Sequence, residues 1–112
     1  MYLGVYFMKE FLIDFKKLDW ETAYRGQRQK TYSKGKDQLR LVELTDEYHE
    51  EEWCEKEHIG YVLEGRIIID FDEESITFNQ GDGIFITGGK ENRHKGKIAK
   101  DEKVLILFFE KV

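Results

Sequence analysis

Residues 58–71 read HIGYVLEGRIIIDF, which is two runs rich in β-branched and aromatic residues on either side of the pair Glu64-Gly65. Residues of these types favour strands, and a glycine after a polar residue is typical of a turn. The stretch therefore predicts two successive strands separated by a tight turn. It sets the pattern for most of the chain.

Short apolar runs separated by turn-forming residues continue in both directions from this stretch. The runs are QLRLVEL (38–44), SITFN (75–79), GIFIT (83–87), HKGKIA (94–99) and KVLILFFEKV (103–112), and glycine or acidic residues separate most of them. Many short strands with little helix signal predict a single all-β domain, an antiparallel sandwich or barrel over about residues 37–112. Before it we expect a short irregular or helical segment, with one helical turn at 18–24 capped by Asp19.

Composition excludes several classes of protein. The 112 residues are 40% hydrophobic, enough for one core, and their net charge of −5 argues against nucleic-acid binding. A single cysteine excludes an internal disulfide and suits a reducing compartment. No run approaches the roughly 20 apolar residues that span a bilayer. We expect a soluble, cytoplasmic protein, in which the apolar residues 1–8 are an extension or a strand exchanged with a partner.

Residues that can bind a metal ion cluster before the first of these strands. In an extended chain the even-numbered residues Glu52, Cys54 and His58 share one face. Thiolate, imidazole and carboxylate together suit zinc, while imidazole with carboxylate also suits iron or manganese. The sequence thus offers a candidate metal site, to which the later His94 could contribute. We find no phosphate-binding loop and no nucleophile–base pair with an orienting third group.

These residues resemble the two motifs of the cupins, which are small double-stranded β-helix barrels of the jelly-roll type. The resemblance rests on HIGYVLEG (58–65) followed by GDGIFITGG (81–89). Aligning Gly65 with the last glycine of the first motif places His58 at the usual glutamate ligand. The same alignment places Cys54 and Glu52 at the two histidine ligands. WCEKEHIGYVLEG (53–65) and ENRHK (91–95) are similar to the small bacterial cupins named for a DHCW motif.

The second motif starts at Gly81 and places Thr87 where cupins carry a proline, in a chain without any proline. Its histidine position falls on Asn92, with His94 two residues later, and either residue could fill that place. The resemblance implies a divalent ion held by Cys54, His58 and His94, with Glu52 as a fourth ligand. Thiolate favours zinc, and iron or nickel also fit such a set.

The resemblance also implies a small-molecule pocket inside the barrel, with Arg40, Tyr61 and Phe85 as candidate lining residues. If Arg40 points inward it could anchor a carboxylate, and if it points outward it is an ordinary surface charge. Three functions follow from this resemblance: a metal-dependent enzyme, a non-catalytic ligand-binding or sensing protein with a degenerate metal site, and a structural module. The first two are favoured. Because small cupins commonly pair, we also expect a homodimer.

Overall fold

The computed structural model describes residues 11–112, whose regular secondary structure is mostly strand. The expectations for residues 1–8 lie outside the described residues. The elements are the 3₁₀ turns η2 (Phe15–Lys17) and η3 (Lys90–Asn92) and the strands β1 (Glu21–Tyr24), β2 (Gln27–Lys34), β3 (Asp37–Thr45), β4 (His58–Glu64), β5 (Arg66–Asp70), β6 (Ser75–Asn79), β7 (Gly83–Ile86), β8 (Lys95–Lys97) and β9 (Lys103–Lys111).

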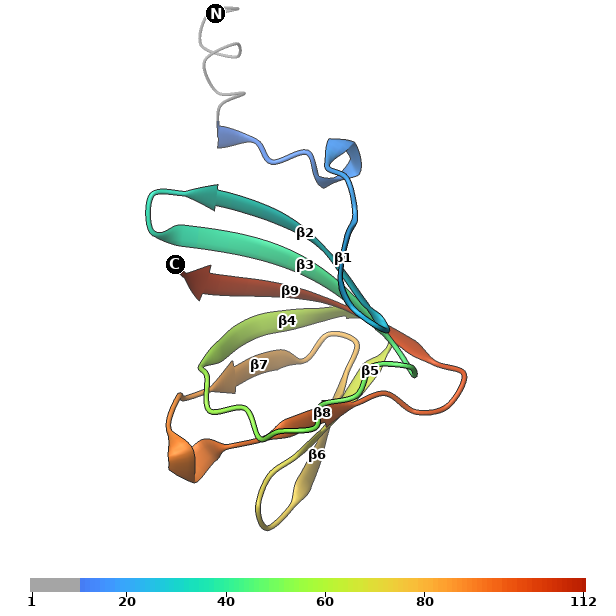
Figure 1. Ribbon diagram of the computed structural model, residues 1–112. Coiled ribbons are helices and arrows are strands. Elements are labelled where there is room, and N and C mark those ends of the chain that lie inside the picture. Colours follow the sequence, from blue (N-terminus) through green and yellow to red (C-terminus); the bar gives the residue numbers. More distant parts are fainter. Residues whose placement is uncertain (1–10) are drawn as a thin grey trace, which may run out of the picture.

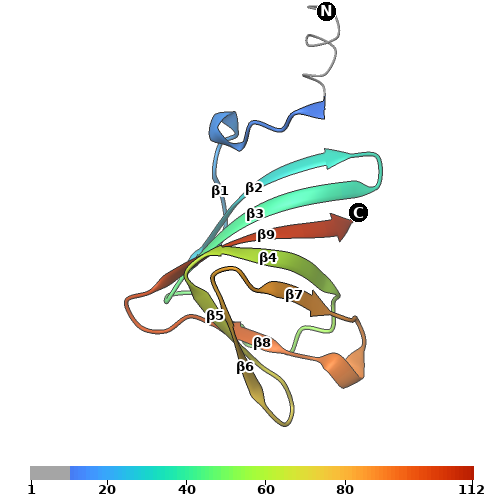
Figure 2. The same cartoon turned by 180° about the vertical axis from the view of Figure 1, so that it is seen from behind.

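The strands form two antiparallel sheets that face each other, as Figure 1 and the reverse view in Figure 2 show. The larger sheet has the order β1-β2-β3-β9-β4-β7, and the smaller has the order β6-β5-β8. The predicted all-β jelly-roll fold is confirmed.

The core lies between the two sheets and is made mainly of alternate residues from β3, β4, β5, β7 and β9. Residues on one face of a strand are spaced by two, so each strand contributes only its inward positions. The buried apolar side chains are those of Val42, Leu44, Val62, Ile67, Ile69, Ile84, Ile86, Ile98, Val104 and Ile106. Six of them, Val42, Leu44, Ile67, Ile69, Ile84 and Ile86, also line an inner cavity beside His58 and His94.

Gly65 marks the point where the chain passes from one sheet to the other. The strands before and after it do not pair with each other: β4 pairs with β7 and β9, and β5 pairs with β6 and β8. The φ angle of Gly65 is +76°, a conformation that L-amino acids with a side chain disfavour. The turn predicted at Glu64-Gly65 is therefore a corner between the sheets.

The chain before residue 37 differs from the expectation. The helical turn predicted at 18–24 is wrong, because Glu21–Tyr24 is strand β1 and pairs with β2. The large sheet thus begins at Glu21, well before the predicted start of the barrel. A single helical turn gains few internal hydrogen bonds, so the edge of a long neighbouring strand offers the segment a better set. None of the helices within residues 11–112 has the length and apolar character needed to cross a membrane.

Candidate metal centre

The candidate ligands come from three places that the fold brings together. His58 is the first residue of β4, Cys54 lies in the long connection between β3 and β4, and His94 directly precedes β8. The backbones of Cys54 and His94 form an isolated antiparallel bridge, in which each N–H donates to the other residue's carbonyl at 2.8 and 2.9 Å. This bridge ties the connection to the strand that carries the late histidine.

The side chains of Cys54, His58 and His94 meet inside the open end of the barrel. Within residues 11–112 their ligand atoms lie within 4.8 Å of one another. The Sγ atom of Cys54 is 3.6 Å from Nε2 of His58. Two tetrahedral zinc ligands, with bonds of about 2.3 Å to sulfur and about 2.0 Å to nitrogen, stand about 3.6 Å apart. The donor set and the spacing of Cys54 and His58 therefore fit a zinc ion.

His94 is oriented as metal-binding histidines usually are. Its side chain is 3% exposed, and its Nδ1 donates to the backbone oxygen of Asn92 at 3.0 Å. Because that carbonyl can only accept, the proton of the neutral ring lies on Nδ1 and the lone pair lies on Nε2. Nε2 is buried and has no hydrogen-bond partner among the described residues. Histidines that bind a metal through one ring nitrogen usually donate the N–H of the other nitrogen to a carbonyl or carboxylate, as Nδ1 of His94 does here.

His58 is held in its neutral form. Burial, together with the smaller effects of the neighbouring His94 and Arg40, lowers its pKa from 6.5 to about 4. Its Nδ1 is also buried without a partner within residues 11–112. A catalytic cysteine–histidine pair needs a third group that orients the histidine, and nothing in the described chain performs that role here. The pair of Cys54 and His58 suits metal binding better than nucleophilic catalysis.

A cavity of about 80 Å³ lies beside these side chains. Its inner wall is apolar and its outer wall is polar, and the lining residues are Gln27, Arg40, Val42, Leu44, Tyr48, Glu50, His58, Ile67, Ile69, Ile84, Ile86, His94, Gly96 and Phe108. The outer wall also borders a wider groove of about 1160 Å³ at the mouth of the barrel, where Cys54 lies. A small molecule entering from the groove would pass the candidate ligands before reaching the apolar wall.

The expected fourth ligand, Glu52, is not part of this cluster. Its side chain is exposed on the groove, whereas Glu50 lines the inner cavity. One oxygen of Glu50 accepts a hydrogen bond from the hydroxyl of Tyr48 at 2.5 Å, and the other is buried without a partner in the described part of the chain. The parity that grouped Glu52 with Cys54 and His58 also includes Glu50. The sequence therefore contained this signal, but the run of three glutamates indicated only a solvated loop.

Arg40 lies in the cavity lining, but its charge is already paired. Its Nε and Nη2 donate to the two carboxylate oxygens of Glu110 at 2.9 and 2.6 Å, and its Nη1 donates to Gln29 at 3.1 Å. Burial would raise the pKa of Glu110, but hydrogen bonds from Arg40 and Gln38 outweigh burial and hold it below its usual range. Because the guanidinium is committed to this pair, it is not a free anchor for a carboxylate.

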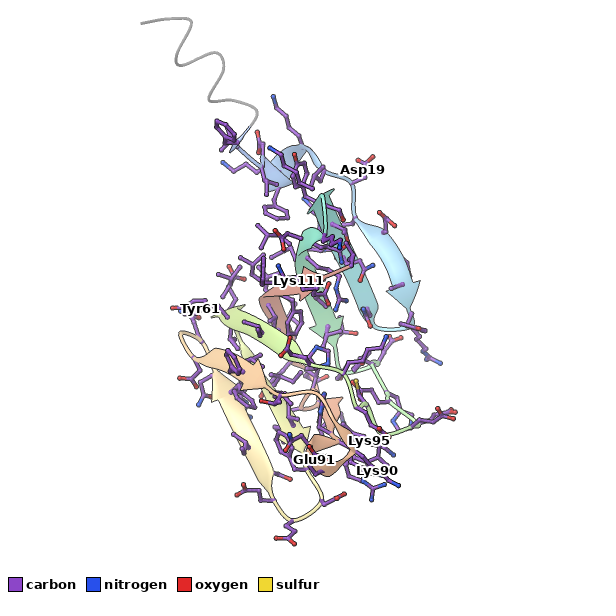
Figure 3. The ribbon with its side chains drawn as sticks, turned by 90° about the vertical axis from the view of Figure 1, so that its left-hand side faces the viewer. Asp19, Tyr61, Lys90, Glu91, Lys95 and Lys111 are labelled. Atoms are coloured by element: carbon purple, nitrogen blue, oxygen red, sulfur yellow. The ribbon has the colours of Figure 1, made fainter. Side chains whose placement is uncertain are left out.

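Tyr61 and Phe85, the two aromatic residues expected in the pocket, point the other way. They are 49% and 73% exposed, and Tyr61 lies at the outer surface of the molecule (Figure 3). The prediction that they line the pocket is wrong, because successive residues of a strand point to opposite faces. In β4 the inward residues are His58, Gly60 and Val62, so Tyr61 faces outward. In β7 the inward residues are Ile84 and Ile86, so Phe85 faces outward. Phe108 of β9 is the aromatic residue that lines the cavity instead.

Comparison with known proteins places the chain in a family. Residues 42–110 match the family described as cupin domain. No curated protein matches the chain at a significant level. The narrower similarity to the DHCW-motif cupins stays a prediction.

Solved structures with the same fold are numerous, and three examples show how closely they match this chain. KdgF from a Halomonas species has a TM-score of 0.71 at 16% identity and covers 90% of this chain and 93% of its own. A cupin-2 domain protein from Shewanella frigidimarina has a TM-score of 0.67 at 23% identity, covering 94% and 99%. A cupin sugar phosphate isomerase from Silicibacter pomeroyi has a TM-score of 0.73 at 16% identity, covering 90% and 75%. The match over most of the barrel, together with the fold and the inward site, shows that the chain belongs to the cupin family.

Proposed function

We propose that this protein is a metal-binding cupin that binds a small organic molecule at the open end of its barrel. Cys54, His58 and His94 hold the ion. The observation that carries the proposal is the buried Nε2 atom of His94, which has no hydrogen-bond partner among the described residues and belongs to the cluster with Cys54 and His58. Buried polar atoms are nearly always satisfied, so this atom indicates an occupant of the cavity.

Zinc is the favoured ion. The set of one thiolate and two neutral imidazoles is softer than the ligand sets of magnesium or calcium, although iron and nickel also accept it. Three protein ligands leave one tetrahedral position free for water or a bound molecule, which is typical of catalytic rather than structural zinc sites. A bound ion would act as a Lewis acid or activate water at that position.

The ligand class follows from the cavity and from the neighbouring folds. An apolar inner wall and a polar mouth suit a small organic molecule with one polar end. Two structures with the same fold are named as a sugar phosphate isomerase and a polyketide cyclase, both of which act on small organic molecules. We infer that this chain does too, in the reducing compartment that its free Cys54 suits.

A second candidate function is non-catalytic binding of a small ligand at a degenerate metal site. It is favoured by the exposure of Glu52, which removes the fourth ligand expected from the family motif. In this case the cavity would bind its ligand without an ion. The two functions differ in whether the purified protein contains metal.

The test is elemental analysis of protein purified without metal-affinity resin, followed by zinc titration of the apo protein. We expect one ion per chain in the wild type and its loss in Cys54→Ala and His94→Ala. His49→Ala is the matched control, because His49 is an exposed histidine on the groove that is not among the three clustered ligands. A folded wild type that binds no zinc, iron or nickel would contradict the metal-binding function and favour the second candidate.

We also infer that the chain forms a homodimer through the outer face of the large sheet. Strand register aligns Leu39, Phe109, Ile59 and Phe85 in one apolar row across β3, β9, β4 and β7, and Phe85 is largely exposed. Exposed apolar rows of this kind mark association surfaces. Light scattering should give a dimer mass for the wild type and a monomer mass for Phe85→Glu. Thr77→Glu on the exposed face of β6 should leave the dimer intact, and a monomeric wild type would contradict the inference.

A further inference from the structure

The buried polar atoms without partners all belong to one cavity. Within residues 11–112 these side-chain atoms are Nδ1 of His58, Nε2 of His94 and Oε2 of Glu50, and the three residues line the same space. The proposed ion accounts for Nε2 of His94. It does not account for Oε2 of Glu50, a buried acceptor that is costly to leave without a donor.

Tyr48 fixes the orientation of this carboxylate. Its hydroxyl donates to Oε1 of Glu50 at 2.5 Å. Burial and the adjacent Glu50 raise the pKa of Tyr48 above its usual range, so the hydroxyl keeps its proton and remains a donor. With one oxygen held by Tyr48, the other remains as an acceptor.

No cation neutralises Glu50 within the described part of the chain. It takes part in none of the ion pairs there, and Arg40, the basic residue of the cavity lining, is engaged by Glu110. Because Oε2 of Glu50 is buried, its negative charge is weakly screened and opposes the binding of an anion beside it. It attracts hydrogen-bond donors for the same reason.

We propose that Glu50 is a specificity-determining residue that selects neutral, hydrogen-donating ligands and rejects carboxylates and other anions. This inference rests on the proposed function. A divalent ion with the thiolate of Cys54 and the carboxylate of Glu50 carries no net charge, so an anionic ligand gains little attraction. The preferred molecule presents a hydroxyl or N–H group to Oε2 of Glu50 and an apolar body to Ile67, Ile69, Ile84 and Ile86.

The test uses the wild-type protein loaded with Co²⁺, whose visible spectrum reports both metal binding and exogenous ligands. Two probes are titrated: azide, an anion without a donor, and imidazole, a neutral molecule with an N–H donor. We expect the wild type to bind imidazole more tightly than azide. In Glu50→Gln we expect azide affinity to rise roughly tenfold or more, because a buried charge facing the anion is removed. Co²⁺ affinity should stay within about threefold of wild type, because Glu50 is not a ligand.

Two matched variants complete the experiment. Glu50→Asp keeps the charge and should keep the weak azide affinity of the wild type. Glu51→Gln removes an exposed neighbouring charge and should leave both probes unchanged. If Glu50→Gln does not fold, the order of the two probes in the wild type decides, and azide binding at least as tightly as imidazole would overturn the inference.

The other outcomes separate this inference from the proposed function. Bound Co²⁺ with unchanged azide affinity in folded Glu50→Gln would overturn the inference alone. Loss of Co²⁺ in that variant would also overturn it, by making Glu50 a ligand. A wild type that binds no Co²⁺ would contradict the metal-binding function and this inference with it.

Discussion

Replacing Gly65 by alanine should strongly destabilise this small barrel. At φ +76° an alanine is in the left-handed region, which costs about 1–2 kcal/mol. The added Cβ would lie 2.2 Å from the backbone oxygen of Lys103, and that oxygen belongs to β9 and cannot rotate away. Relieving the overlap requires the corner between the sheets to move off β9, which resembles overpacking of a core at about 1–3 kcal/mol. We expect a loss of about 4 kcal/mol in the free energy of unfolding.

Gly35→Ala is the matched control. Gly35 also has a positive φ, +62°, but a Cβ built there meets no heavy atom within 4 Å. It should lose about 1–2 kcal/mol from conformation alone. Urea denaturation followed by circular dichroism measures both variants. Equal losses for the two glycines would refute the reasoning, because it would mean that contact with β9 contributes nothing.

Three further predictions concern the metal site and its surroundings. Chelation should lower the melting temperature, because metal at 100 times its dissociation constant adds about 2.7 kcal/mol to stability. In the metal-free protein the folded pKa of His58, about 4, lies below its ordinary 6.5. As the pH falls, His58 therefore takes up a proton in the unfolded chain before it does so in the folded protein, which favours unfolding. The free energy of unfolding, measured by denaturation, should be constant above pH 6.5 and fall by at most about 3 kcal/mol toward pH 4. A flat profile, or the same slope in His58→Gln, would contradict this assignment. Glu110→Gln should cost about 2 kcal/mol by leaving half-buried Arg40 without its charged partner. By contrast, Glu47→Gln opposite the exposed Arg25 should change the unfolding midpoint very little, and equal effects would argue against a role for burial.

Much of the fold could be predicted from short-range pattern. The alternation in QLRLVEL and the turn at Glu64-Gly65 depend on neighbours in sequence, and both appear in the structure as β3 and the corner after β4. The N-terminal segment could not be predicted in this way. Residues 21–24 carry no strong strand pattern, and they form β1 because β2 offers an edge.

The candidate site, too, was predictable only in part from the sequence. The sequence by itself determined which residues could bind a metal, because only one cysteine and three histidines are present. Of these, Cys54 and His58 are both even-numbered and close in sequence, so they share one face of an extended chain. Tertiary structure alone decided which of them meet: the bridge between Cys54 and His94 joins positions forty residues apart, and it selects His94 over Asn92. It also placed Glu50 rather than Glu52 in the cavity lining and paired Arg40 with Glu110. The physical reason is that donor chemistry is a property of a side chain, whereas burial and pairing are properties of the space between two sheets.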